Sequence, residues 1–321
     1  MMPVALTSRT LAGLQEVSYI LVSPLSVGVV RWLKARLQGR RGPDPLQAYR
    51  DLWKLLRIRP TRPASASPVF LFAPALVFTS YALLGLALPM FVVPAGQGMD
   101  FLLVIGLITL AKFIGTLAAF DAGSPFGPMS AGRQWFIQVL AEPALFGAAY
   151  IFALSGGTTN VSHLVSHSSH VSLLFTKPII AIAIGGLLFV LLAEAGRLPF
   201  DRPDTHLELT MIEEGIVLEY SGRALALMWW GYAMKLTFVL SLVAFLALPP
   251  AGVPSTPLGQ LILSVVLYLA KLGVLLLVLA VWETARSKMP LRAILPQLML
   301  GAGVLLFTLA SLILTDIQAG R

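Results

Sequence analysis

The chain has 321 residues, of which 57% are hydrophobic and only 12% are charged. Soluble domains carry about 25% charged residues, so this composition excludes an ordinary soluble protein and indicates a polytopic membrane protein. The absence of cysteine excludes disulfides, iron–sulfur clusters held by thiolates and thiolate zinc sites in this chain.

Eight apolar segments are long enough to cross a bilayer, which needs about twenty residues. They cover residues 12–33, 69–93, 101–120, 134–155, 177–196, 224–248, 258–281 and 292–315. Turns rich in Pro and Gly separate several of them. The sequence therefore predicts an all-α polytopic membrane protein with about eight transmembrane helices, forming one transmembrane domain over residues 1–321. The first helix follows Arg9 without a small-residue cleavage site, so we expect it to be retained.

The distribution of Lys and Arg predicts the orientation. Of the 23 basic residues, seventeen fall in the first, third, fifth and seventh loops, three lie on the other side, and three lie inside spans. The positive-inside rule then places those four loops in the cytoplasm and both termini outside. It also explains the net charge of +8 without a nucleic-acid partner.

The first cytoplasmic loop, residues 34–67, is basic and amphipathic. A helix is expected from Pro45, with an apolar face that includes Leu52 and Trp53 and with basic residues between the apolar ones. Such a helix can bind anionic lipid headgroups or dock a cytoplasmic protein, and the two roles are compatible.

Several ionisable residues fall inside or at the ends of the predicted spans: Lys112, Glu142, Lys235, Lys271 and Glu283. Charges within a membrane face protein or water and pair with one another. They are either structural pairs and snorkelling lysines, or sites that exchange protons. The sequence does not say which of them touch.

Three histidines, His163, His167 and His170, are spaced so that one helix face would present three imidazoles. That spacing can bind a metal. The segment is rich in serine and has no carboxylate, so a solvated outer loop is the favoured interpretation and no metal site is predicted.

The fifth loop, residues 197–223, is acidic and cytoplasmic. The stretch from Glu194 to Ser221 holds seven of the fifteen acidic residues of the chain, between two strongly apolar segments. This concentration of carboxylates beside a bilayer is costly and marks the loop as the centre of the molecule's function.

Motifs in this loop resemble those of a known family. Glu194, Arg197, Pro199-Phe200-Asp201, Asp204, Glu208-Leu209 and Glu219-Tyr220-Ser221-Gly222 are similar to the signature loop of the membrane subunit beside the quinone cavity of respiratory complex I. The same family includes the membrane subunits of energy-converting nickel–iron hydrogenases. Arg40 to Leu56, Phe120 to Gln134 and Ala141-Glu142-Pro143 resemble its formate hydrogenlyase branch.

Two departures from the complex I pattern fall where a quinone cavity would lie. His206 stands where complex I members often carry glutamate, and the segment Thr210 to Leu218 is longer than theirs. These departures argue against quinone binding and favour the hydrogenase branch. A quinone-site subunit of complex I (NADH-quinone oxidoreductase) and a stand-alone ion transporter or passive scaffold are the alternatives.

The resemblance implies a subunit without its own cofactor, which couples an oxidoreductase to ion translocation in a bacterial or archaeal cytoplasmic (inner) membrane. The implied partners are a hydrogenase-type large subunit, an iron–sulfur small subunit, a ferredoxin-like subunit and antiporter-like membrane subunits, with iron–sulfur clusters and nickel–iron in the partners. The implied coupling residues are Glu142, Glu194, Asp201, Asp204, Glu208, Glu213 and Glu219. Burial adds Lys112, Lys235, Lys271 and Glu283. The residues expected to dock the redox arm are Arg36, Arg40, Arg41, Arg50, Asp51, Lys54, Arg133 and Arg197.

Overall fold

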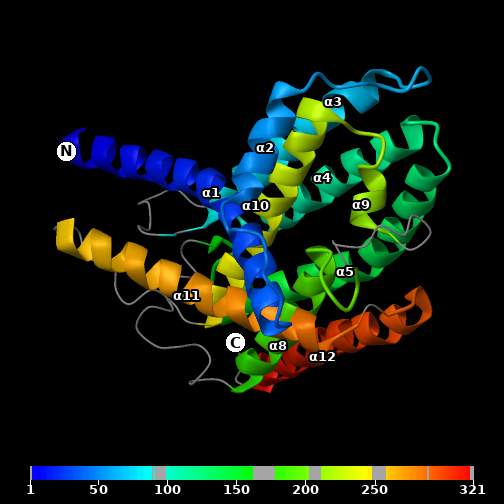
Figure 1. The fold of residues 1–321 in the computed structure, drawn as a ribbon. Helices are drawn as coiled ribbons and strands as arrows, with labels where there is room; N and C mark the ends of the chain where they lie inside the picture. Colours follow the sequence, from blue (N-terminus) through cyan, green and yellow to red (C-terminus); the bar gives the residue numbers. More distant parts are fainter. Residues whose placement is uncertain are drawn as a thin grey trace.

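The computed structural model describes residues 2–88, 90, 99–161, 178–201, 211–247, 258–287 and 289–318. Across these ranges the regular elements are helices (Figure 1). They are α1 (Met2–Leu37), α2 (Gln47–Arg57), α3 (Pro68–Leu83), the 3₁₀ helix η1 (Leu84–Ala87), α4 (Phe101–Asp121), α5 (Phe126–Gly156), α8 (Pro178–Glu194), α9 (Glu213–Ile216), α10 (Gly222–Ala247), α11 (Leu258–Ala285) and α12 (Leu291–Gln318).

Among the described residues, seven helices are long and apolar enough to cross a membrane: α1, α3 with η1, α4, α5, α10, α11 and α12. The shorter apolar helix α8 occupies the remaining predicted span, and its described part begins directly after residues 162–177, which lie outside the described ranges. The predicted all-α, multi-pass architecture is confirmed. The orientation of the termini stays a prediction.

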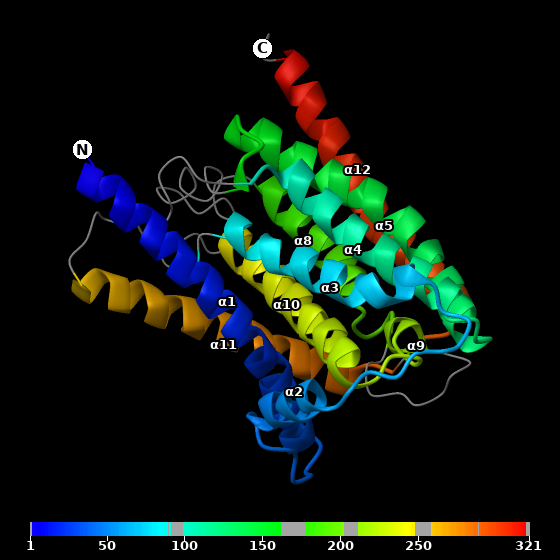
Figure 2. The same ribbon diagram turned by 90° about the horizontal axis from the view of Figure 1, so that it is seen from above.

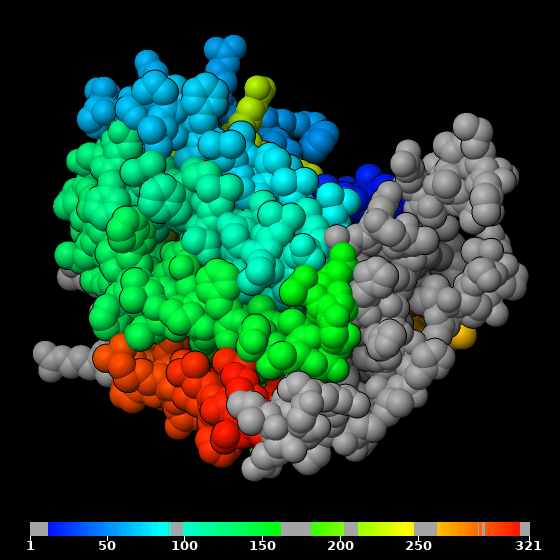
Figure 3. Space-filling view, turned by 180° about the vertical axis from the view of Figure 1, so that it is seen from behind, coloured from blue at the N-terminus to red at the C-terminus, as the bar shows by residue number. Residues whose placement is uncertain are grey.

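Helix α10 is the axis of the bundle. Within its apolar stretch 83% of residues are buried, against 22% for α11 and α12. Helices α3, α4, α5, α8 and α12 form a continuous body on one side of this axis, and Figure 3 shows α4, α5 and α12 as adjoining surfaces. Helices α1 and α11 run beside each other on the other side (Figure 2). The short helices α2 and α9 lie at one end, away from the start of α1 and the end of α12.

Proline shapes α1 where it meets α10. Pro24 lies inside α1 and has no N–H, so it cannot donate to the carbonyl of Ile20 one turn earlier. That carbonyl accepts hydrogen bonds from Nε1 of Trp230 on α10 (2.9 Å) and from Oγ of Ser23 (2.9 Å). The missing helical bond is thus replaced by a contact that joins the two helices.

Two predicted boundaries differ from the structure. The second span, expected over 69–93, changes at Leu84 from α-helix to the 3₁₀ helix η1. The fourth, expected from 134, begins at Phe126. Pro128 lies in the first turn of α5, where a helix does not need its N–H. Gly123, with φ of +73°, makes the turn before it.

The start of α3 is capped from another helix. Asp121, at the end of α4, accepts hydrogen bonds through Oδ2 from the backbone N–H of Ser67 (2.8 Å) and of Phe70 (3.3 Å). Helix N-termini leave such groups without partners inside the helix. This carboxylate therefore ties the end of the first loop to the end of α4.

We predict that Asp121→Ala lowers the unfolding free energy by about 1 kcal/mol, the usual cost of losing an N-terminal cap. Thermal unfolding of the purified protein in detergent measures it. Asp44→Ala is the control, because Asp44 forms an exposed pair with Arg50 and such pairs contribute little. Equal midpoints for the two variants would contradict the capping role.

Candidate functional site

Two buried lysine–glutamate pairs lie at the centre of the bundle. Nζ of Lys112 on α4 is 2.7 Å from Oε1 of Glu194 at the end of α8, and both side chains are almost fully buried. Lys235 on α10 pairs with Glu213 at the start of α9. Lys235 also interacts electrostatically with Lys112 and Glu194. The four groups form a central quartet of two positive and two negative charges.

Aromatic rings complete the surroundings of Lys235. Its Nζ lies 5.1 Å from the ring centre of Tyr232 and 5.8 Å from that of Tyr81. Cations over aromatic faces are stabilised when they are desolvated. Glu213, in contrast, carries the most exposed side chain of the quartet, at 14%. The quartet therefore opens toward water on the side of α9.

A second buried cluster lies near the last turn of α1, at the end of the bundle where α2 lies. Glu283 on α11 forms two ion pairs. One is with Nζ of Lys34 on α1 (2.9 Å), and the other is with Nη1 of Arg197, which follows α8 (3.3 Å). Nearby, Nε1 of Trp282 donates to the carbonyl of Leu198 (2.9 Å), and N–H of Met289 donates to the carbonyl of Pro199 (3.2 Å). The triad of Glu283, Lys34 and Arg197 therefore holds the beginning of the acidic loop against α1 and α11.

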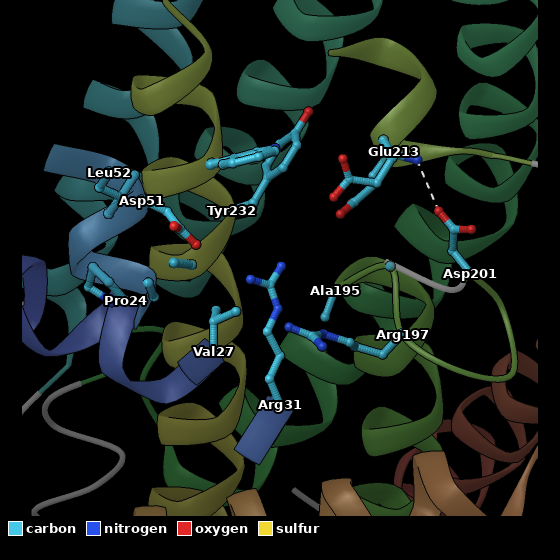
Figure 4. Close-up of a pocket in the computed structure, with 15 residues that line it drawn as sticks. Pro24, Val27, Arg31, Asp51, Leu52, Ala195, Arg197, Asp201, Glu213 and Tyr232 are labelled. Carbon is cyan, nitrogen blue, oxygen red and sulfur yellow. Dashed lines mark hydrogen bonds between the residues drawn. The ribbon is translucent and has the colours of Figure 1, made fainter. Parts of the chain in front are cut away.

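A cavity of about 90 Å³ lies beside both clusters. Figure 4 shows Arg31 of α1 pointing into it, with Arg197 beside it and Glu213 and Tyr232 on its far side. Its charged lining is Arg31, Asp51, Arg197, Asp201, Glu213 and Glu214. Oδ2 of Asp201 accepts the backbone N–H of Glu213 (3.0 Å) and so fixes the start of α9.

Gly196 lets Glu213 approach the end of α8. It has φ of +60°, and a Cβ built on it would lie 2.6 Å from the carboxylate carbon of Glu213. No side chain fits there without moving the carboxylate. The left-handed backbone also disfavours every residue except glycine.

Glu214 is a cavity carboxylate with a raised pKa. Burial, followed by the negative charge of Glu213, raises its pKa from the ordinary 4.5 to about 7. This carboxylate therefore titrates nearer to neutral pH than an ordinary glutamate does, beside a paired neighbour on the same short helix.

The structure brings together seven of the residues predicted from sequence: Lys112, Glu194, Arg197, Asp201, Glu213, Lys235 and Glu283. It leaves three others apart. Glu142 is half-buried and accepts from Gln138 of its own helix, Lys271 is half-buried on α11, and Glu219 is half-buried and does not line the cavity. Asp204, His206, Glu208, His163, His167 and His170 lie outside the described residues.

The residues expected to dock a redox arm separate into two groups. Arg36, Arg40, Arg41, Arg50 and Lys54 are exposed around α2. Asp51 lines the cavity, Arg133 donates to the carbonyl of Met211 (3.1 Å), and Arg197 is buried in its pair with Glu283. Arg133 and Arg197 thus hold this chain's own acidic loop.

Sequence reasoning did not select Arg31, Lys34, Glu214 or Tyr232. Arg31 and Lys34 lie at the end of the first apolar segment, where they contribute to the positive charge that predicts the orientation. Their positions at the end of an apolar helix were the available signal, since such residues can turn inward. Among the described residues, no group of three His, Asp or Glu side chains is arranged to hold a metal ion.

An all-helical bundle with paired charges at its axis and a charged cavity at one end places this chain among multi-pass membrane proteins. The family model described as NADH dehydrogenase matches residues 11–315, and the chain belongs to that family.

Individual relatives give a finer comparison. The chain is 32% identical to formate hydrogenlyase subunit 4 of Escherichia coli over 87% of its own length and 90% of that protein. It is 31% identical to hydrogenase-4 component C of the same organism, over 85% and 86%. Its fold resembles a chain of the membrane-bound sulfane sulfur reductase, an archaeal respiratory membrane complex, with a TM-score of 0.82, 18% identity and coverage of 95% and 99%.

We predict that Gly196→Ala displaces Glu213 from Lys235 and destabilises the protein by about 1–3 kcal/mol, the usual cost of a strained backbone. Gly185→Ala on α8 is the matched control, because nothing lies within 4 Å of a Cβ built there. The thermal midpoints of both variants in detergent decide the matter. A Gly196→Ala protein as stable as the control would show that Glu213 can move at no cost.

Glu214 predicts a pH dependence with a definite sign. The folded protein binds a proton between pH 4.5 and about 7 that the unfolded chain has released, so stability falls as pH rises through this range. The slope from this group is at most ~1.4 kcal/mol per pH unit. Thermal midpoints from pH 5 to 8 should fall less steeply for Glu214→Gln than for the wild type. Parallel curves would count against the raised pKa.

Proposed function

We propose that this chain is the membrane-anchoring and energy-coupling subunit of a formate-hydrogenlyase-like, membrane-bound nickel–iron hydrogenase complex. In a bacterial or archaeal cytoplasmic membrane, it links electron transfer in a cytoplasmic arm to the translocation of protons or sodium ions. The observation that carries the proposal is the central quartet, Lys112, Glu194, Lys235 and Glu213, opening on a charged cavity at the end where α2 and α9 lie.

The quartet is suited to coupling because its side chains are largely shielded from water. A charge change nearby acts through a low effective dielectric and shifts the proton affinities of interacting groups. A redox reaction at the cavity end would first act on Glu214 and Asp201, and then on the pair of Glu213 with Lys235. The proposed route continues to Glu194 with Lys112, and includes Asp204 and Glu208 of the acidic loop and Glu142, Glu219, Lys271 and Glu283.

The relatives named for formate hydrogenlyase and hydrogenase-4 support a place for this chain in a multi-subunit oxidoreductase complex. The proposed contacts are a hydrogenase-type large subunit, an iron–sulfur small subunit and a ferredoxin-like subunit, which hold the metal cofactors, and antiporter-like subunits in the membrane. The exposed basic residues around α2, among them Arg36, Arg40, Arg41, Arg50 and Lys54, supply a docking surface for the cytoplasmic arm or for anionic lipid.

Quinone fits the cavity poorly. Ligand pockets are mostly apolar and begin at roughly 300 Å³, whereas this cavity has about 90 Å³ and six acidic or basic side chains in its lining. We therefore expect a quinone-site inhibitor to leave the activity of the purified complex unchanged. Inhibition would favour the alternative of a complex I quinone-site subunit.

We predict that Glu213→Gln abolishes most ion translocation while the assembled complex keeps its electron-transfer activity. Glutamine has nearly the same shape but cannot carry the charge or proton that the pair with Lys235 requires. The measurement is ion uptake by vesicles containing the whole complex, divided by substrate turnover.

The control variant is Asp44→Asn, which removes the charge of an exposed carboxylate in the first loop. Because removing one partner of a buried pair can cost 3–5 kcal/mol, assembly is checked by co-purification with the large subunit. The double variant Glu213→Gln with Lys235→Met removes both charges and restores assembly if the single variant is unstable. Full ion translocation in an assembled variant lacking this pair would contradict the coupling role.

A further inference from the structure

Glu16 is an acidic side chain within α1 that belongs to neither cluster described above. It lies inside the candidate span Ala12–Leu37. At 1.5 Å per residue, it is roughly 22 Å along the helix from Arg31 in the cavity. Glu16 is therefore near the opposite end of the bundle. Carboxylates at such positions are rare and mark functional sites by default.

The fold provides a niche for this carboxylate. A Cβ on Gly85 of η1 would collide with Oε2 of Glu16 and with the ring of Tyr19, so only glycine leaves room for both. Oε2 is buried and has no hydrogen-bond partner among the described residues. An ionised carboxylate left in this way is costly, whereas a protonated one is neutral.

Polar residues continue one side of α1 after Glu16. Tyr19, Ser23 and Ser26 follow Glu16 at helical spacing and form a polar face whose side chains are at most 1% exposed. Oγ of Ser26 is also buried without a hydrogen-bond partner in the part of the chain that the structure describes. The buried side chain of Val30 separates this polar face from Lys34, which pairs with Glu283.

The same face touches the surroundings of the central quartet. The hydroxyl of Tyr19 donates to the carbonyls of Met234 (2.8 Å) and Tyr81 (3.1 Å). Met234 precedes Lys235, and the ring of Tyr81 lies under the Lys235 amine. Glu16 and Tyr19 also interact electrostatically. The niche is thus adjacent to the groups that surround the quartet.

We propose that Glu16 is a proton-exchange site of this subunit, near the side of the membrane opposite the cavity, at the end of the polar face of α1. The carboxylate binds one proton, forming one O–H bond, and releases the same proton to water at that side, so that no oxidant or reductant is needed. The inference rests on the proposed function and adds a release site within this chain.

Labelling with dicyclohexylcarbodiimide tests the site in the intact complex, because this apolar reagent adds to protonated carboxylic acids. Peptide mass spectrometry should find an adduct on Glu16 that diminishes as pH rises from 6 to 9. Asp100 is the control: it is an exposed carboxylate at the start of α4 that accepts from Thr159 (3.0 Å), and it should remain unlabelled. Absence of an adduct on Glu16 throughout this range would overturn the proposal without any variant.

Ion translocation per turnover is then measured in vesicles with Glu16→Gln and with the matched control Asp100→Asn. The expected result is loss of most translocation in the first and none in the second. Full translocation with Glu16→Gln would overturn the inference, and the proposed function would stand if Glu213→Gln still uncouples the complex. If neither Glu16→Gln nor Glu213→Gln uncouples the complex, the proposed function itself fails.

Discussion

The arrangement of helices in this protein depends on the cost of placing charge in a medium of low dielectric. A buried ion pair adds little net stability, but separating its members leaves an uncompensated charge that is very unfavourable. Each buried pair therefore selects which helices adjoin. Lys112 with Glu194 joins α4 to α8, Lys235 with Glu213 joins α10 to α9, and Glu283 joins α11 to α1 and to the acidic loop.

The cavity is where this paired interior meets water. Glu213 and Glu214 are neighbours on the short helix α9, yet they face different environments. Glu213 contacts Lys235, whereas the pKa of Glu214 is raised to about 7 by burial and by Glu213. Since the charge of one affects the proton affinity of the other, any event that protonates Glu214 changes the field at the quartet. Asp201 accepts the backbone N–H at the start of α9, and Gly196 leaves room for the Glu213 carboxylate, so both residues help to place Glu213 beside Lys235.

Hydropathy was sufficient to predict the helical class and nearly all span positions, because a bilayer demands long apolar runs. It also placed Lys112, Lys235 and Glu283 inside or at the ends of spans, and these three are buried, whereas Glu142 and Lys271, predicted in the same way, are only half-buried. The partners of these charges did not follow from sequence, since Lys112 and Glu194 meet only when α4 and α8 are placed. Arg197 was expected on the docking surface because a loop follows it, but Glu283 on α11 draws it inside. Arg31 and Lys34 look alike as loop-end charges, and only tertiary packing sends one into the cavity and the other to Glu283.

Helix α1 is the one described element that contacts the cavity, the triad and the niche of Glu16. Arg31 enters the cavity, Lys34 pairs with Glu283, and Tyr19 donates to carbonyls of α10 and α3. At Pro24 its backbone lacks one helical bond, and Trp230 of α10 donates to the carbonyl left over. A displacement of α1 relative to α10 would therefore change all three sites together. A helix fixed to its neighbour by side-chain bonds at a proline can transmit such a displacement, because less of its own hydrogen bonding opposes a bend at that point.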